Sequence, residues 1–129
     1  MALGGRADMP HLPHPAPVDA YGNGGFRFAG MSHRGSLLCF PDGIWAWPIN
    51  DVTELDEAAL AAVFDRAESI DVFLLGAGRD PWVLPDKLRQ RFRELSLTVD
   101  AMTTGAAVRT YNILLAENRR VGAGLVAVA

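Results

Sequence analysis

The chain is 129 residues long, with 50% hydrophobic and 21% charged residues and a formal net charge of −3. This length fits one domain whose core needs neither disulfide bonds nor a structural metal. The slightly acidic balance argues against general nucleic-acid binding, which needs a basic face. No apolar run reaches the roughly 18 to 20 residues of a membrane-spanning helix. Cys39 is the only cysteine, so we expect a cytoplasmic protein with no integral membrane segment and no intrachain disulfide.

Residues 1–17 are rich in glycine and proline and show no periodic apolar pattern, which predicts a flexible tail. The segment lacks the apolar core of a secretory signal and the Arg/Ser repetition of a mitochondrial transit peptide. It contains His11 and His14, but two imidazoles on a flexible, Pro-rich segment hold a metal poorly. We therefore predict no metal site, and a single folded domain over residues 18–129.

Residues 18–48 combine short strand-forming runs with tight turns. Asn23-Gly24-Gly25 is typical of a hairpin turn, and Pro41-Asp42-Gly43 indicates a second one. Aromatic and aliphatic residues between and after these turns favour strands. This part of the chain is predicted to form an antiparallel meander.

From Asp56 onward, helical and strand patterns alternate. Asp56 can cap a helix whose apolar residues recur on one face, and residues 70–75 form an apolar run typical of a central parallel strand. The later elements are predicted as helices at residues 88–95 and from residue 103, and as strands at residues 97–100 and 121–128. Such alternation implies crossovers over a mostly parallel sheet. The predicted fold class is therefore α/β, with helices packed on the sheet and an antiparallel N-terminal β portion.

A candidate pocket is predicted where the strand at residues 70–75 ends and the helix after residue 100 begins. Gly76-Ala77-Gly78 follows that strand directly, and Thr103 and Thr104 stand where a helix N-cap belongs. In open α/β sheets pockets form at the carboxyl edge, and the free N–H groups of a helix start bind anions or small polar groups. Capping alone is the simpler interpretation of the two threonines. The candidate pocket residues are Gly76, Ala77, Gly78, Thr103, Thr104 and Arg109, although helical spacing places Arg109 away from the buried face.

No complete set of catalytic residues is recognisable. Gly76-Ala77-Gly78 lacks the third glycine of the dinucleotide motif and the Gly-Lys-Ser/Thr of a P-loop, so no cofactor is predicted. Cys39 lies on an apolar strand with no histidine nearby in sequence, which favours a buried, inert thiol over a nucleophile.

Three tryptophans form a candidate partner surface. Trp45 and Trp47 share one face of a strand, and Trp82 follows the glycine turn. Exposed tryptophans anchor protein partners, whereas buried ones belong to the core. We expect one of the three in the core and partial exposure of the others.

Three motifs occur in a fixed order: Gly24-Gly25-Phe26-Arg27-Phe28-Ala29-Gly30, then Gly76-Ala77-Gly78, then Met102-Thr-Thr-Gly-Ala-Ala-Val-Arg-Thr-Tyr-Asn112 with Glu117 and Arg119-Arg120-Val121. Over residues 18–129 their order and spacing resemble the respiratory complex I assembly factor 3-like family. That family also includes an adipogenesis-associated protein and many small bacterial and archaeal domains. The resemblance implies a three-layer fold around a central mixed five-stranded sheet, and it implies no catalytic residues. The chain departs from the family at Ala77, where threonine is common, and at Thr103, where aspartate is common.

The leading hypothesis is a non-enzymatic binding or assembly-accessory domain that recognises a protein partner. It depends on the missing catalytic set and on the resemblance, since mitochondrial members of that family help to assemble complex I. The alternative is a domain that binds a small molecule or an anion, of which a weak enzyme is one version. Its pocket would be centred on Gly76–Gly78 and Thr103. The sequence leaves the identity of the partner and a homo-oligomer open.

Overall fold

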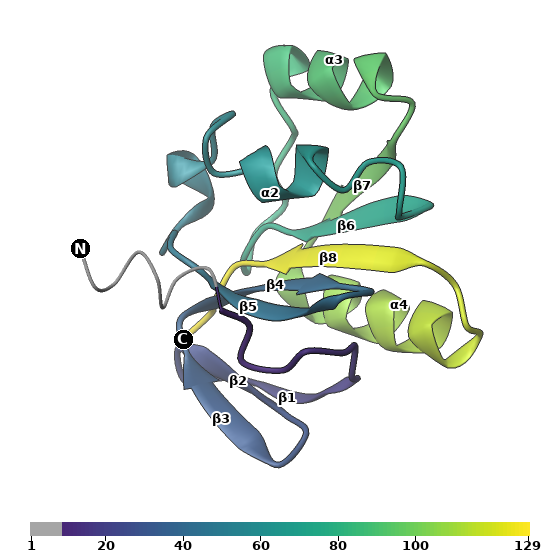
Figure 1. Cartoon of the computed structure of the whole chain (residues 1–129). Coiled ribbons are helices and arrows are strands. Elements are labelled where there is room, and N and C mark those ends of the chain that lie inside the picture. The colour runs from purple at the N-terminus through teal and green to yellow at the C-terminus, as the bar shows by residue number, and fades with distance from the viewer. Residues whose placement is uncertain (1–8) are drawn as a thin grey trace.

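The computed structural model describes residues 9–129, which form two β-sheets and the helices that cover them (Figure 1). In chain order the elements are β1 (Val18–Gly22), β2 (Gly25–Phe28), β3 (Met31–Arg34), β4 (Ser36–Phe40), β5 (Gly43–Trp47), the 3-10 helix η1 (Val52–Glu54), α2 (Ala61–Phe64), β6 (Val72–Gly76), α3 (Asp86–Glu94), β7 (Thr98–Met102), α4 (Thr104–Ala116) and β8 (Val121–Leu125). The three strands β1, β2 and β3 form one sheet, and the remaining five form the central sheet.

The central sheet has the order β5-β4-β8-β6-β7 and is mixed. Strands β8, β6 and β7 run parallel, whereas β4 is antiparallel to both β8 and β5. Helix α3 connects β6 to β7, and helix α4 connects β7 to β8, as parallel neighbours require. The predicted α/β class with a five-stranded mixed sheet is confirmed.

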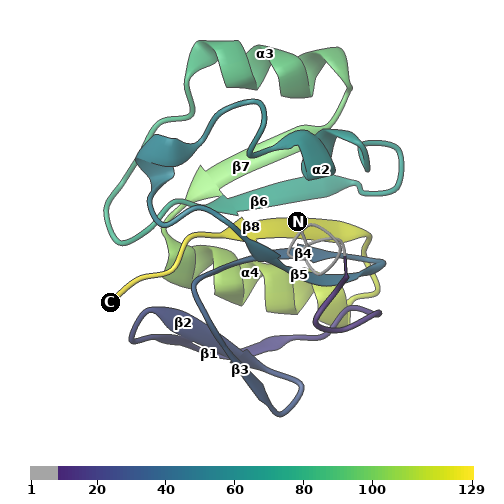
Figure 2. The ribbon, with the colours of Figure 1, turned by 60° about the vertical axis from the view of Figure 1, so that its left-hand side comes forward.

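Two layers cover the central sheet, with α2 and α3 on one face and α4 and the three-stranded sheet on the other (Figures 1 and 2). Strand β6 shows why its sequence is apolar throughout. Leu74 packs in the core shared with α4, while Phe73 and Leu75 pack in the core shared with α2 and α3. Because both faces of the strand are buried, both alternating sets of side chains are hydrophobic. The three-layer arrangement implied by the resemblance is confirmed.

A glycine in β8 keeps two aromatic rings close to the sheet. A Cβ atom at Gly124 would lie 2.8 Å from Cζ of Phe73 and 2.8 Å from Cζ3 of Trp47. The absence of a side chain at this position therefore lets Phe73 and Trp47 pack directly on the backbone of the central strand.

The predicted antiparallel meander is divided between the two sheets. Asn23 and Gly24 both have positive φ, 53° and 80°, which fits the tight turn between β1 and β2. Strand β3 ends at Arg34, and the φ of 102° at the following Gly35 turns the chain away from the small sheet. Ser36 enters β4, and its Oγ accepts a hydrogen bond from the N–H of Ala127 at 2.9 Å. The strand-forming runs are thus correctly identified, but β4 and β5 belong to the central sheet because β4 pairs with β8, which lies far away in the sequence.

The segment before β1 packs against the domain, in contrast to the predicted flexible tail. The N–H of His11 donates to the carbonyl of Ile44 at 2.8 Å, and the N–H of Ile44 donates to the carbonyl of Leu12 at 2.9 Å. Ala16 is buried, and its carbonyl accepts a hydrogen bond from the Tyr111 hydroxyl at 3.0 Å. Partners about 30 to 95 residues away in the chain hold this segment, so its local composition does not indicate the packing. The rest of the predicted tail, residues 1–8, lies outside the described residues.

The helix predicted from Asp56 is much shorter than expected. The carboxylate of Asp56 accepts a hydrogen bond from the N–H of Ala59 at 2.8 Å, but regular α-helix covers only Ala61–Phe64. Arg66 explains the early end. Its Nη1 donates to the carbonyl of Ala62 at 3.0 Å, the group that a continuing helix would offer to the N–H of Arg66 itself. That N–H bonds the carbonyl of Val63 instead, at 3.0 Å.

Candidate functional site

The glycine turn after β6 and the start of α4 meet at one edge of the central sheet. The N–H of Ala77 donates to the carbonyl of Met102 at 2.8 Å, and the N–H of Thr104 donates to the carbonyl of Gly78 at 2.9 Å. The Thr104 hydroxyl accepts from the N–H of Gly78 at 3.0 Å and donates to the carbonyl of Val126 at 2.7 Å. One buried threonine therefore joins the turn, the helix and the chain after β8.

This junction is closely packed, so the predicted pocket does not lie at its centre. Thr104 is fully buried, and both hydrogen-bonding functions of its hydroxyl are used. A Cβ atom at Gly76 would lie 3.0 Å from Cα of Thr104 and 3.1 Å from Cβ of Ala107. The absence of a side chain at Gly76 therefore allows α4 to pack closely against β6. Three of the six candidate pocket residues, Gly76, Ala77 and Thr104, are buried in this packing.

The other three candidates, Gly78, Thr103 and Arg109, lie beside the junction. They line a surface cleft of about 460 Å³, which we call the α4 cleft. Tyr21 and Arg79 also line it, although Arg79 Nη2 donates to the carbonyl of Ala129 at 2.7 Å. Helical spacing correctly keeps Arg109 off the buried face of α4, which leaves it exposed beside the cleft.

The first turn of α4 opens onto the α4 cleft. The Thr103 hydroxyl accepts from the N–H of Ala106 at 3.4 Å, so Thr103 is the N-cap residue. Gly105 faces the hydroxyl of Tyr21, which occupies the space that a side chain at Gly105 would need. Sequence reasoning missed Tyr21 because it comes from β1 in the other sheet. Arg79 could have been found, since it follows the glycine turn directly.

The three tryptophans do not form one surface. Trp47 is 3% exposed, and its indole Nε1 donates to the carbonyl of Ala59 at 2.9 Å. Trp45 and Trp82 are both half-buried, but Trp82 lines a different cleft, which it shares with Ala77 and Gly78. The expected distribution, one tryptophan in the core and two partly exposed, agrees with this placement. The Trp47 ring packs on the central strand, so only Trp45 and Trp82 keep partly exposed indole rings.

Trp45 belongs to an apolar groove between the edge strand β5 and α2, which we call the β5–α2 groove. The groove has a volume of about 460 Å³. Its apolar lining consists of Leu38, Phe40, Trp45, Ala46, Trp47, Pro48, Ala58, Ala59, Ala61 and Ala62. Asp65 and Arg66 add charge at one side. The sequence indicates Trp45 and Trp47 as candidate surface residues. The alanines of the opposite wall show no sequence pattern that would mark them as part of a binding surface.

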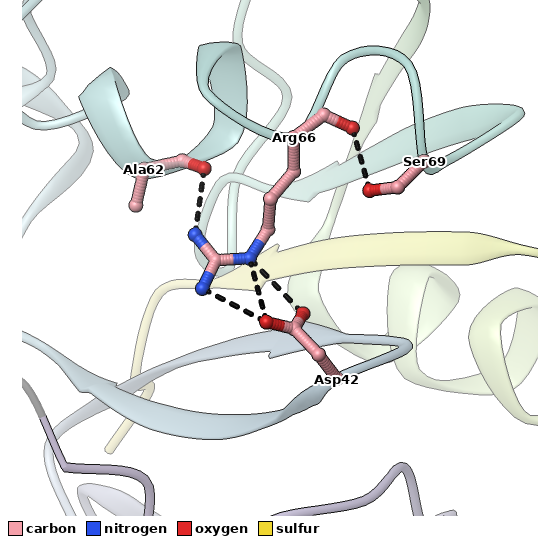
Figure 3. Close-up of polar contacts among 4 residues, drawn as sticks. All are labelled: Asp42, Ala62, Arg66 and Ser69. Carbon is pink, nitrogen blue, oxygen red and sulfur yellow. Dashed lines mark hydrogen bonds and ion pairs between the residues drawn. The ribbon is translucent and has the colours of Figure 1, made fainter.

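Arg66 is held rigidly over the aromatic side chains of this groove. Its guanidinium carbon lies 4.4 Å from the ring centre of Phe40 and 4.7 Å from that of Trp45. Its Nε lies 3.0 Å from Oδ1 of Asp42, and Nη2 lies 3.2 Å from Oδ2, so the carboxylate takes two parallel contacts (Figure 3). The bond from Nη1 to the Ala62 carbonyl completes the arrangement (Figure 3). Arg66 thus ties the β4–β5 turn to α2.

The single cysteine is unsuited to nucleophilic chemistry. Cys39 is 0% exposed in β4, and burial raises the pKa of its thiol to about 12, while a hydrogen bond with Tyr111 opposes that shift. The raised pKa keeps the thiol protonated at neutral pH, and its burial keeps it out of contact with any substrate. Within residues 9–129, no group of three or more His, Cys, Asp or Glu side chains is arranged to hold a metal ion.

Within the described residues, no helix combines the length and the apolar character that a membrane crossing requires.

Comparison with known proteins places this fold and these motifs in a family. Residues 18–126 match the family described as "Protein of unknown function (DUF498/DUF598)". The chain is 42% identical over 110 residues to an uncharacterised protein of Rhodobacter capsulatus, with 85% of this chain and 83% of that protein aligned. It is 47% identical to a crystal structure described as an outer membrane protein from Bartonella henselae, with a TM-score of 0.88, and the match covers 92% of this chain and 100% of that chain.

A more distant relative agrees with the resemblance found in the motifs. The chain is 29% identical over 112 residues to NADH dehydrogenase (ubiquinone) 1 alpha subcomplex assembly factor 3 of Drosophila melanogaster. The aligned part is 84% of this chain but only 57% of the fly protein. The resemblance to assembly factor 3-like proteins is thereby confirmed. The chain belongs to the DUF498/DUF598 family.

Proposed function

We propose that this chain is a protein-binding accessory domain, without enzymatic activity of its own, that takes part in the assembly of an NADH dehydrogenase complex. The β5–α2 groove is the observation that carries this proposal, because it offers an apolar, preformed surface for a partner segment. The 29% identity to the fly protein supports the choice of complex, since that protein is named as an NADH dehydrogenase assembly factor.

The composition of the β5–α2 groove suits an amphipathic segment of a partner. The half-buried Trp45 presents ring surface, while Ala61 and Ala62 keep the α2 wall low enough for inserted side chains. Aromatic and arginine side chains dominate the energetics of protein interfaces. Arg66 is already fixed by Asp42 and by the Ala62 carbonyl, so binding would immobilise few further rotamers. The apolar face of a partner helix laid into such a groove is a recurring recognition mode.

Affinity capture with a charged groove variant tests this proposal. The full chain, tagged and expressed in its native cell, is expected to co-purify with subunits of an NADH dehydrogenase. Ala61 is exposed at the start of α2 and lines the groove, so Ala61→Glu places a charge in the apolar surface without disturbing the core. We expect this variant to reduce recovery of those subunits at least about tenfold, which corresponds to roughly 1.4 kcal/mol.

The matched control is Ala116→Glu, which changes an exposed alanine at the end of α4, outside the groove. Its recovery of the same subunits should equal that of the wild type, and both variants should keep the wild-type Tm. Undiminished recovery with a folded Ala61→Glu variant would reject the groove as the docking surface. Absence of any NADH dehydrogenase subunit from the wild-type capture would reject the assembly role.

A second candidate function, anion binding, is favoured by the chemistry of the α4 cleft. Arg79 and Arg109 line the cleft together with Thr103 and the hydroxyl-bearing Tyr21. The same cleft contains the start of a 13-residue helix, where the N–H of Gly105 makes no hydrogen bond within the described residues. The positive end of the helix dipole adds to the two guanidinium charges. A phosphate or carboxylate group is the ligand class that fits these donors.

Titration with inorganic phosphate, followed through the amide resonances of Gly105 and Ala106, tests the second candidate. We expect saturable shifts in the wild type and about tenfold weaker binding in Arg109→Gln, because one charge-assisted contact is lost. Arg93→Gln removes an exposed guanidinium from α3, outside the cleft, and should bind like the wild type. Equal weakening by both variants would indicate a general charge effect and would exclude a specific anion site.

A further inference from the structure

The two edges of the central sheet differ in what covers them. At the β5 edge, the segment before β1 forms an antiparallel bridge between Leu12 and Ile44. At the opposite edge, β7 pairs only with β6, and no strand of residues 9–129 lies on its outer side (Figure 2). An uncovered edge strand is a template for another strand, so natural proteins usually protect such an edge or use it for binding.

The outer side of β7 carries free backbone groups at regular spacing. The carbonyl of Met102 accepts from the N–H of Ala77, so Met102 turns its backbone groups toward β6. Because backbone groups alternate along a strand, Val99 and Ala101 turn their N–H and C=O groups outward. Within the described residues, no hydrogen bond reaches these outward groups. A partner strand in antiparallel orientation can therefore bond both residues.

The face of β7 that turns away from α3 carries one exposed carboxylate, that of Asp100. Val99 and Ala101 pack in the core beneath α3, so Thr98 and Asp100 project from the other face, and both are exposed. Asp100 forms no ion pair within residues 9–129. A side chain directly opposite Asp100 on an added strand would have its Cβ atom roughly 5 Å away. A basic residue suits that position.

The flank of α3 beyond β7 is basic. Arg91 contacts Glu57, in the segment before α2, and so marks the flank of α3 that faces α2. Helical spacing places Arg89 and Arg93 on the opposite flank. Both side chains are exposed, and Arg89 makes only a 3.4 Å contact to the Leu84 carbonyl. On an added strand, the side chains that point toward α3 would face Arg89 and Arg93. Acidic side chains therefore suit those positions best.

We infer that the free edge of β7 binds an extended segment of a partner protein in which acidic residues flank a basic one. The basic residue lies opposite Asp100, and its acidic neighbours point toward Arg89 and Arg93 on α3. This surface is separate from the β5–α2 groove, and the inference does not depend on the proposed function.

A second copy of β7 is a poor occupant of the same edge. Antiparallel pairing about the centre of β7 would place Asp100 directly opposite the same carboxylate of the second copy, and like charges in that position destabilise a sheet. The sequence Thr98–Met102 also supplies no acidic residue next to its central aspartate. The charge pattern thus opposes self-association while it admits a partner with the complementary pattern.

The test titrates the ¹⁵N-labelled full chain with the heptapeptide Val-Thr-Glu-Lys-Glu-Thr-Val and with its charge-reversed form Val-Thr-Lys-Glu-Lys-Thr-Val. We expect the first peptide to shift the amide resonances of Val99 and Ala101 and to bind about threefold to tenfold more tightly than the second, as expected for cross-strand charge pairs. Asp100→Lys should weaken binding of the first peptide by a similar factor. Ala101→Pro, which removes an outward N–H at an edge that tolerates proline, should abolish it.

Two further variants make the outcome decisive. Asp19→Lys makes the same charge change on exposed β1 and should leave binding unaltered, as should the groove variant Ala61→Glu. Unshifted Val99 and Ala101 resonances with both peptides, or equal affinity of wild type and Asp100→Lys, would overturn the inference. A dimer that Ala101→Pro dissociates would overturn it as well, because the occupant would then be a second copy. None of these results bears on the subunit capture that tests the proposed function.

Discussion

Replacing Tyr111 with alanine is expected to lower the free energy of unfolding by about 3 to 5 kcal/mol, the range typical of large aromatic side chains removed from a core. Tyr111 is fully buried between α4 and the central sheet. Its ring packs in the same core as Leu74 of β6 and Ile44 of β5, so truncation would leave a cavity that its neighbours cannot fill. Urea unfolding at neutral pH, followed by circular dichroism, measures the change.

The control variant Tyr111→Phe separates the ring from its hydroxyl. It keeps the packing but removes the hydrogen bond to the Ala16 carbonyl, so we expect a loss of only about 1 to 2 kcal/mol. Faster amide exchange in residues 11–17 should accompany it, because Tyr111 helps to hold this segment. If the two variants were equally destabilised, the hydroxyl rather than the buried ring would carry the contribution of Tyr111.

Replacing Thr104 with valine is expected to lower the free energy of unfolding by about 2 to 4 kcal/mol, although the two side chains have nearly the same shape. The hydroxyl accepts a hydrogen bond from the N–H of Gly78 and donates one to the carbonyl of Val126. Valine can do neither, so both backbone groups would lose this hydrogen bond. A buried polar group without a hydrogen bond costs about 1 to 3 kcal/mol. Thermal and urea unfolding measure the effect.

The neighbouring threonine provides the comparison. Thr103→Ala removes only an N-cap whose hydrogen bond is 3.4 Å long, so about 1 kcal/mol is expected. Thr104→Val should therefore be the more destabilising change. The reverse order would mean that capping of α4, and not the connection between the turn and the C-terminal segment, is the main contribution of this threonine pair.

The buried junction around Thr104 also supports the α4 cleft, so the stability of this junction bears on function. Gly78 and Thr103 belong to the cleft, while Thr104 fixes their backbone from beneath. A site whose lining residues are anchored by buried neighbours loses little freedom when a ligand binds. Substitutions at Thr104 should accordingly alter any ligand affinity of the cleft without touching the ligand.

Local sequence patterns predicted most elements of the second half of the chain. The apolar run before Gly76 is typical of a strand covered on both faces, and Thr103 followed by a helical pattern indicates the start of α4. The motif around Thr103 also carried the family resemblance. The apolar pattern after Asp56 predicts a longer helix than the structure contains. The end of the helix depends on the hydrogen bond from the Arg66 guanidinium to the Ala62 carbonyl, which the pattern does not indicate.

The candidate site was predictable only in part. The sequence indicates that Gly78 and Thr103 meet at one edge, since parallel strands end together. It does not indicate that Thr104 is sealed beneath them, because its partner Val126 lies 22 residues further along the chain. Nor does it show that Tyr21, from the other sheet, stands over Gly105.

The α/β class, the order of most strands and helices and the burial of Cys39 follow from the spacing of apolar residues and from turn chemistry, so they can be predicted from the sequence alone. Which surfaces stay available to a partner depends instead on how the elements pack together. In the folded domain Trp47 is buried, His11 and Leu12 bond to Ile44 of β5, and no strand of residues 9–129 pairs with the outer edge of β7. These outcomes depend on contacts between residues far apart in the chain, which local periodicity does not encode.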